Sequence, residues 1–450
     1  MSDTVKTVAE HYRSIELKGK WKISDRSTDY GRLVIPTGNG DEPFHRWFRM
    51  KEAYSFSLFG RLVKDSGEDL AESFSVLDPF SGSGTTAVSA LNAAADHGVA
   101  SHVTLIERNP VLRIVAASKA TGLLHGTNLA TTVDDVLPSV LDAHSRYVRS
   151  EYGLTTPSVT LNNEKYYPPS HTLSLLALAR AVQSVSDPDA RLVLQTCLAS
   201  AVEPSGRLRR DGRALRYTPE RSPGLPEDLF KTAVDRCVQD LRTIAQANVS
   251  STVDVVAGDA RQADRYVDGE TYDWIVFSPP YPNNIDYTEV YKTEAWALGC
   301  FENAAEMKAQ RLSTVRSHTS IYFPDDYLYR SLENSKKVEE ITEPLIQAVP
   351  SDRYERGRKQ LISGYADDML SVFMALRKLA HAKTRLVFVV GNSVHGSGDH
   401  RLVIAADVML AALAELTGWR VEEIRVAREL RRRADDLDHL RESVVCLRPA

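Results

Sequence analysis

The sequence predicts an α/β protein with a mostly parallel sheet that is interrupted by a helical insertion. Short, β-rich apolar segments at 75–80 and 103–106 are typical of buried strands, and a helical segment at 86–96 separates them. Strands that alternate with helices in this way usually form a parallel sheet. The interval 125–248 has the apolar spacing of helices instead, so it predicts the insertion.

Bulk composition excludes several classes of protein. The 450 residues suffice for a large core and more than one domain. The net charge of −5 argues against a surface that binds nucleic acid uniformly, so a nucleic-acid footprint would have to be local. With no secretory signal and no apolar run of about 18 residues, the sequence favours a cytoplasmic protein without membrane contact. The four cysteines form no Cys-x-x-Cys pair, which argues against a zinc knuckle or a disulfide framework.

The N-terminal region precedes the first strand. Residues 1–40 are polar and contain many turn-forming residues, which predicts a loosely structured lead-in. Residues 52–63 carry Tyr54, Leu58 and Leu62 on one helical face, which predicts a helix. Such a helix either covers a bound ligand or belongs to the core.

A glycine-rich turn joins the strand at 75–80 to the helix that follows it. Gly82 and Gly84 allow a tight turn and the close approach of a ligand, and the helix N-terminus offers free N–H groups. No Lys follows Gly84 and the spacing is not G-x-G-x-x-G, so the turn differs from both common phosphate-binding patterns. Glu107 ends the next strand 23 residues later (107 − 84), near the spacing of about 20 for a carboxylate that binds a ribose hydroxyl.

The insertion at 125–248 contains helical patterns at 171–185, 190–202 and 226–248. An irregular arginine-rich segment, 204–217, lies between the last two. Arginine side chains suit phosphates and guanine edges, so the segment predicts a contact with nucleic acid; a solvated loop is the alternative. The candidate contact residues are Arg207, Arg209, Arg210, Arg213 and Arg216.

A proline-rich turn follows a further predicted strand at 272–277. Pro279 and Pro280 fix φ and remove two donors, so the chain leaves the sheet as a stiff, extended turn. Ser278 and Tyr281 then lie at the carboxyl edge of the sheet, where open α/β sheets bind ligands. Hydrogen-bond acceptors beside an aromatic ring suit a planar base with an exocyclic amine. A turn with a purely structural role is the alternative.

The C-terminal part completes the predicted sheet. Residues 295–355 have mixed character and predict a second insertion. The tract at 427–436 is basic and then acidic, so it either contacts a nucleic-acid backbone or forms a solvated turn. The glycines beside His395 and His400 favour a turn, and no metal site is predicted. The remaining elements are strands at 253–257, 386–390, 419–427 and 442–449, the last two as a hairpin, and helices at 110–120, 367–381 and 403–418.

Together, the two turns resemble motifs of the amino-group DNA methyltransferases that use S-adenosylmethionine. DPFSGSGTT (78–86) is similar to their cofactor motif, and SPPY (278–281) is similar to the N4-cytosine branch, whereas N6-adenine enzymes more often carry DPPY or NPPY. The resemblance covers about half of the chain and implies a Rossmann-like methyltransferase fold. Further similar motifs are RWFRMKEAYS (46–55), IERNP (106–110), GDAR (258–261) and VVGNS (389–393).

The resemblance also implies roles for individual residues. Glu107 would bind the ribose of S-adenosylmethionine and Asp259 its adenine amino group. In the SPPY turn, Ser278 and the Pro279 carbonyl would grip the target amine while Tyr281 stacks on an extruded base. The implied cofactor-binding residues are Lys51, Asp78, Pro79, Phe80, Ser81, Gly82, Gly84, Thr85, Thr86, Glu107, Asn109, Asp259 and Ala260, and the implied catalytic residues are Ser278, Pro279, Pro280 and Tyr281.

The implied partner is double-stranded DNA, with a cognate restriction nuclease as a second partner. Three other functions stay open. SPPY disfavours an N6-adenine enzyme, no RNA-binding module supports an RNA methyltransferase, and the intact motifs argue against an inactive DNA-binding scaffold. Which insertion recognises the site is also open. The expected organisation is a lead-in (1–40), a catalytic domain in three pieces (41–124, 249–294 and 356–450), a helical insertion (125–248) and a second insertion (295–355).

Overall fold

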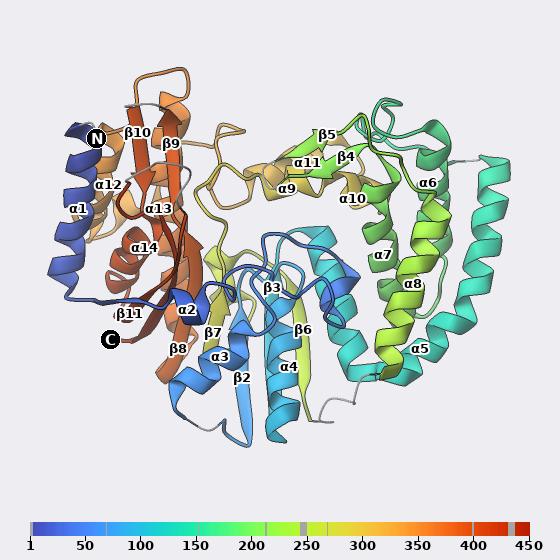
Figure 1. Ribbon diagram of the computed structural model, residues 1–450, viewed down its shortest axis with the longest axis horizontal. Helices are drawn as coiled ribbons and strands as arrows, with labels where there is room; N and C mark the ends of the chain where they lie inside the picture. The colour runs from blue at the N-terminus through green and yellow to red at the C-terminus, as the bar shows by residue number, and fades with distance from the viewer. Residues whose placement is uncertain are drawn as a thin grey trace.

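The computed structural model describes residues 3–68, 70–151, 153–211, 214–243, 250–267, 269–397, 400–430 and 437–450. Its centre is an eight-stranded sheet with the order β6-β3-β2-β7-β8-β12-β11-β1 (Figure 1). Strand β12 is antiparallel to both of its neighbours, and all other neighbouring pairs are parallel. This is a Rossmann-like methyltransferase fold, which confirms the predicted fold class. The strands are β1 (Lys22–Asp25), β2 (Ser73–Asp78), β3 (Ala100–Glu107), β6 (Thr252–Ala257), β7 (Tyr272–Phe277), β8 (Ala380–Gly391), β11 (Trp419–Glu429) and β12 (Arg441–Pro449).

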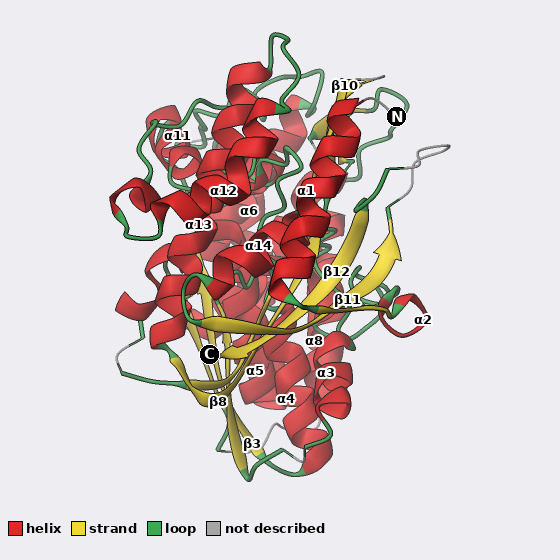
Figure 2. Ribbon diagram, turned by 90° about the vertical axis from the view of Figure 1, so that its left-hand side faces the viewer, coloured by secondary structure: helices red, strands yellow, loops and turns green. Residues whose placement is uncertain are grey.

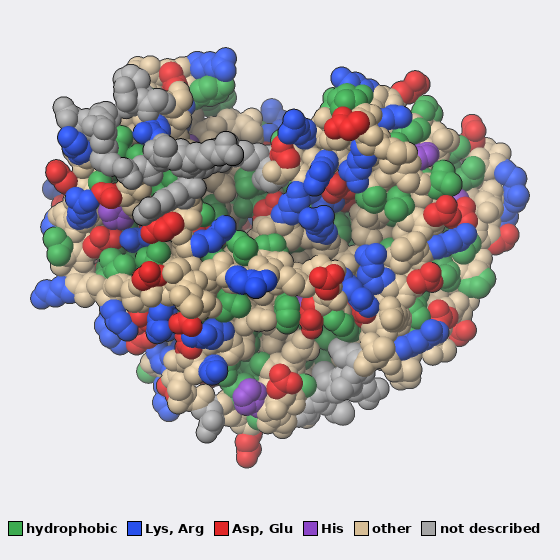
Figure 3. Space-filling model, in the orientation of Figure 1, with side chains coloured by type: hydrophobic (Ala, Val, Ile, Leu, Met, Phe, Trp, Pro, Cys, Tyr) green, Lys and Arg blue, Asp and Glu red, His purple; other side chains and the backbone are tan. Residues whose placement is uncertain are grey.

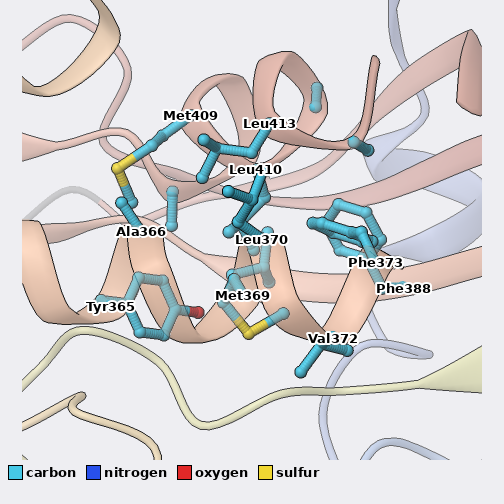
Figure 4. Close-up of a cluster of buried hydrophobic side chains, with 14 of the residues drawn as sticks. Tyr365, Ala366, Met369, Leu370, Val372, Phe373, Phe388, Met409, Leu410 and Leu413 are labelled. Carbon is cyan, nitrogen blue, oxygen red and sulfur yellow. The ribbon is translucent and has the colours of Figure 1, made fainter. Parts of the chain in front are cut away.

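Helices cover both faces of the sheet because alternate strand residues point to opposite sides. Leu77 of β2 and Phe388 of β8 belong to the core beneath α13 (Glu355–Lys378) and α14 (Ala406–Glu415) (Figure 4). Val76 and Val387, one residue away on the same strands, belong to the core beneath α3 (Leu58–Ser66) and α4 (Thr85–His97). The strands are therefore apolar on both faces, as expected for a buried parallel sheet.

The N-terminal segment is not the loosely structured lead-in that the sequence predicted. It forms α1 (Asp3–Gly19), strand β1 and α2 (Ser27–Tyr30), and α1 packs beside α14 (Figure 2). Val5, Val8, Ala9 and Tyr12 are buried, and their spacing is that of one helical face. The Tyr12 hydroxyl donates to the carbonyl of Val403 at 3.1 Å. The sequence did not predict this helix because its apolar face is short and most residues of the segment are polar.

The helical insertion is confirmed as a set of helices: α5 (Pro110–Ser150), α6 (Pro169–Gln183), α7 (Pro188–Val202) and α8 (Pro226–Thr243). They stand beside the β6 edge of the sheet (Figure 1). Helix α5 is longer than expected and has non-helical backbone at Gly126, where the insertion begins. The arginine-rich segment is not irregular but forms a hairpin of β4 (Leu208–Arg210) and β5 (Leu215–Tyr217).

Short helices near the carboxyl edge of the sheet follow the SPPY turn. Helix α9 (Tyr287–Val290) precedes the second insertion, α10 (Lys292–Ala297) reaches its start, and α11 (Ala304–Leu312), η4 (Leu328–Ser331) and α12 (Ser335–Gln347) lie within it. The final two strands, β11 and β12, pair as the predicted hairpin. The segment around His395 also forms a hairpin, β9 (Ser393–Ser397) with β10 (His400–Ile404). Much of the tract at 427–436 lies outside the described residues. None of the described helices is both long and apolar enough to cross a membrane.

Candidate active site

A cavity of about 330 Å³ opens at the carboxyl ends of β2, β3, β6 and β7. It joins the glycine-rich turn, the acidic end of β3, the start of η3 (Ala260–Arg265) and the SPPY turn. The four residues of the SPPY turn line it. So do all the cofactor-binding residues expected from the sequence except Gly84 and Thr86.

Gly84 and Thr86 lie behind the cavity wall and hold it in place. Gly84 has a φ of +81°, and a Cβ there would lie 3.1 Å from Cα of Ala116, so glycine lets the turn pack on α5. The Thr86 hydroxyl donates to Asp78 and contacts the hydroxyl of Tyr54. Burial raises the pKa of Asp78 to about 7, against the opposing effect of these hydrogen bonds.

Glu107 connects the glycine-rich turn to the start of α5. Its Oε2 accepts a hydrogen bond from the Gly82 N–H at 2.7 Å, and its Oε1 accepts from the Asn109 N–H at 2.6 Å. Burial raises the pKa of Glu107 to about 7. Each carboxylate oxygen keeps a further lone pair. The side chain of Asn109 caps α5 by accepting from the N–H groups of Val111 and Leu112.

Asp259 lines the cavity, but two arginines already occupy its carboxylate. Arg108 donates to Oδ2 at 2.7 Å, and the Arg261 guanidinium donates to both oxygens. Burial raises the pKa of Asp259, but the hydrogen bonds and charge of Arg261, with the charge of Arg108, lower it more, so the net pKa lies below its usual range. Arg261 also donates to Asp368 of α13 at 2.9 Å. An ion network therefore links this edge of the sheet to α13.

The SPPY turn is fixed to the two strands beside it. The Ser278 hydroxyl donates to the Val389 carbonyl of β8 at 3.0 Å and lies 3.2 Å from the Tyr281 hydroxyl. The Tyr281 hydroxyl donates to Glu442 of β12 at 2.9 Å. The Tyr281 ring lies against Gly391, where a Cβ would come within 2.8 Å of the ring. Because the Ser278 proton is committed to a carbonyl, the hydroxyl retains only lone pairs for a ligand.

A second wall of the cavity comes from residues to which the sequence assigned no role in the site. Asn283, Ile285, Tyr287 and Thr288 follow the SPPY turn directly. They face a strap, defined here as residues 313–320, which contributes Ser313, Thr314, Val315, Ser317 and His318. The only sequence signal for this wall was its closeness to the SPPY turn and a run of polar residues in the second insertion.

The segment before α3 forms the outer wall. The helix expected at 52–63 begins only at Leu58, and the residues from Met50 to Tyr54 line the cavity instead. Lys51 Nζ donates to the backbone carbonyl of Arg210, so this wall contacts the β4–β5 hairpin. Glu52 Oε2 accepts from the Tyr291 hydroxyl at 2.8 Å, while its Oε1 is buried without a partner among the described residues.

The β4–β5 hairpin separates the candidate DNA-contacting arginines into different environments. Arg209 and Arg216 are directly opposite each other and exposed. Lys and Arg side chains gather on the surface in the region of the hairpin (Figure 3). Arg207 is half-buried. Arg210 is buried and pairs with Glu294 and Glu203, so the prediction that it contacts DNA is wrong. Arg213 lies outside the described residues.

Comparison with known proteins identifies similar Type II methyltransferases. M.BsoBI of Geobacillus stearothermophilus is 24% identical over 457 aligned residues, which cover 90% of this chain and 84% of the relative. M.AvaI of Nostoc sp. and M.AvaI of Anabaena variabilis are each 23% identical over 455 residues, which cover 94% of this chain and 88% of the relative. No family model matches the sequence. The chain is thus similar to Type II methyltransferases over most of its length, and not in the short motifs alone.

Proposed function

We propose that this protein transfers a methyl group from S-adenosylmethionine to the N4 amino group of cytosine in double-stranded DNA. The observation that carries the proposal is that the glycine-rich turn and the SPPY turn line one cavity. The Type II methyltransferase relatives support methyl transfer as the reaction. DNA as the substrate, and cytosine as the base, rest on the resemblance of the two turns to amino-group DNA methyltransferases.

The groups on the cofactor side of the cavity fit S-adenosylmethionine. Its sulfonium and ammonium are cationic, and Glu52, Asp78 and Glu107 line the cavity with carboxyl groups. The Ser81 hydroxyl is buried in the glycine-rich turn without a partner among the described residues, so it is available to the methionine end. Glu107 has lone pairs for the ribose hydroxyls. Asp259 is less suited to the adenine amino group than the sequence suggested, because Arg108 and Arg261 occupy it.

On the base side, the residues of the SPPY turn suit an amine. Methyl transfer breaks the sulfur–methyl bond as the nitrogen–methyl bond forms, and the amine then releases a proton. No covalent nucleophile is required, so the site must hold the methyl group and the amine in line. Ser278 presents lone pairs, and with the Pro279 carbonyl it would grip the amino group. This grip favours a tetrahedral nitrogen whose lone pair is free to attack.

The target base must leave the duplex to enter the cavity. Tyr281 would stack on the extruded base with the ring face that is not packed on Gly391; such stacking is worth about 1–3 kcal/mol per base. Arg209 and Arg216 would contact the DNA backbone beside the cavity. A cognate restriction nuclease, as part of a restriction–modification or defence system, stays a prediction.

Mass spectrometry of DNA from cells that express the protein tests the proposal. We expect N4-methylcytosine in a fixed sequence context. The Ser278→Ala variant should lose about 1–3 kcal/mol of transition-state stabilisation, the range for an unpaired polar group. Ser278→Asp recreates the DPPY form, and we expect it to retain some activity on cytosine.

Ser150→Ala, at the exposed end of α5, is the matched control and should methylate DNA at the parental rate. If the parental protein makes only N6-methyladenine, the choice of base is wrong while the cofactor assignment survives. If Ser278→Ala and Tyr281→Ala both act at the parental rate, the SPPY turn is structural and the proposal fails.

A further inference from the structure

His318 lies on the wall of the cavity that the second insertion builds, and its position is fixed from two sides. Arg316, two residues earlier in the strap, donates from its backbone N–H to Asp368 at 2.7 Å and from its side chain to Asp367 at 2.6 Å. The Asn284 N–H, just after the SPPY turn, donates to the Ser317 carbonyl at 3.3 Å. His318 is therefore held against the segment that leaves the SPPY turn.

The hydrogen bonds around His318 determine which ring nitrogen carries the proton. Asp286 is an acceptor at both oxygens: Oδ1 caps α9, and Oδ2 accepts from Arg311 Nε at 2.8 Å and from the Ser320 hydroxyl at 2.9 Å. The single proton of Ser320 is thus committed to Asp286. Ser320 Oγ also lies 2.8 Å from His318 Nδ1, so it must accept there, and Nδ1 carries the hydrogen.

The other ring nitrogen is then an acceptor without a donor. Burial, and the charge of Arg311, lower the pKa of His318 from its usual value although Asp286 and Glu289 oppose this, which favours the neutral ring. His318 Nε2 is buried and has no partner among the described residues. Asp286 Oδ2, which lies 3.8 Å from Nε2, is also an acceptor. A buried acceptor without a hydrogen-bond donor destabilises the protein, so Nε2 is suited to accept a hydrogen bond from a ligand.

We propose that His318 contacts the target base and accepts a hydrogen bond from its exocyclic amino group through Nε2. This inference rests on the proposed function. A base amino group is the donor that the reaction brings into the cavity, and it has two hydrogens. The SPPY turn and His318, on two walls of the same cavity, would each take one of them. His318 would then select for a base that bears an amino group, and against one that carries a carbonyl at that position.

Two amide variants separate this role from a structural one. His318→Gln carries an amide oxygen far enough along the side chain to replace Nε2, whereas His318→Asn replaces Nδ1 and its bond to Ser320 but leaves no acceptor at the Nε2 position. We expect kcat/KM for DNA to fall on the order of 10- to 100-fold in His318→Asn, as for one unpaired polar group. His318→Gln should stay within about 10-fold of the parental protein, and both should bind S-adenosylmethionine as the parent does.

Fluorescence of 2-aminopurine placed next to the target cytosine reports base extrusion independently of methyl transfer and keeps the amino group of the target base, and we expect a weaker signal in His318→Asn than in His318→Gln. His125→Asn, exposed on α5, is the control. The proposal is overturned if His318→Asn acts at the parental rate, or if both variants lose activity equally while their melting temperatures and cofactor affinities stay parental. Failure of the parental protein to methylate any base would instead refute the proposed function.

Discussion

Glu107 illustrates how a single buried carboxyl couples the site to pH. It accepts hydrogen bonds from Gly82 and Asn109, and burial raises its pKa to about 7. A carboxyl whose folded pKa is raised contributes stability that is fully present below its unfolded pKa, near 4.5. That contribution is lost as the pH rises to about 7, because the folded state must then bury a charge.

We predict that the stability of the parental protein relative to Glu107→Gln decreases between about pH 5 and about pH 8. The difference between their free energies of unfolding should change by at most about 3 kcal/mol, since one pKa unit is worth about 1.4 kcal/mol. Asp78, whose pKa is also raised to about 7, is present in both proteins, and its charge contributes to the raised pKa of Glu107, so the comparison reports Glu107 together with its interaction with Asp78. Denaturant titrations at the two pH values measure the difference. A difference that does not change with pH would show that Glu107 titrates near its ordinary pKa.

Residues carried by one continuous turn could be predicted from the sequence, whereas those brought together by tertiary packing could not. Ser278 and Tyr281 reach the cavity because their strand ends there. The second wall, with His318, depends on how Arg316 ties the strap to α13, which no local pattern shows. Arg209 is exposed and Arg210 is buried because of the register of the β4–β5 hairpin. The sequence does not alternate between apolar and polar residues there, so it did not predict these strands.

The β4–β5 hairpin is the element with the clearest charge pattern. Arg209 and Arg216 are directly opposite each other, and like charges in this arrangement destabilise a hairpin unless an anion lies near both. We predict that changing both to Gln weakens DNA binding and lowers the salt slope by about two units, one for each phosphate contact. The melting temperature should stay the same or rise slightly. Binding titrations across a salt series provide the measurement.

Arg210, the neighbour of Arg209 on β4, is the matched control for this prediction. Its guanidinium pairs with Glu294, whose side chain is fully buried, so Arg210→Gln should destabilise the protein by about 3–5 kcal/mol, the cost of breaking a buried ion pair. If the Arg209 and Arg216 double variant keeps the parental salt slope, the outer face of the hairpin is solvated surface and DNA binds elsewhere.

Elements with a strong apolar pattern were predicted well for a physical reason. Strand β7 has the predicted bounds because a buried parallel strand is apolar along most of its length. Helices α6 and α8 bury one stripe each and α7 is buried on most sides, and the sequence displays these apolar residues directly. Helix α1 buries only a narrow stripe, and its stability comes from α14 and β10, which are distant in sequence.

At the scale of the whole molecule, the helical insertion shares its core with the catalytic part. One cluster of buried side chains joins Phe44 and Trp47, Val111 of the first turns of α5, Leu194 of α7 and Trp296 of α10. Asp240 of α8 stands where these parts meet, and its side chain is almost fully buried. Its Oδ2 accepts from the Phe44 N–H at 3.0 Å and from Trp47 Nε1 at 2.9 Å, and Arg46 pairs with the same carboxylate.

This shared core predicts that the protein unfolds as one unit and that Asp240 contributes to the stability of all of it. Asp240→Asn removes the charge that Arg46 requires, so we expect a loss of about 3 kcal/mol and a single calorimetric transition at lower temperature. The exposed pair of Asp134 in α5 and Arg242 in α8 is the control, and Asp134→Asn should cost less than about 1 kcal/mol. Two transitions, of which Asp240→Asn moves only one, would mean that the insertion is an independent domain. A single transition that shifts as a whole would mean that the walls of the cavity and the β4–β5 hairpin share one folding equilibrium, since both rest on this core.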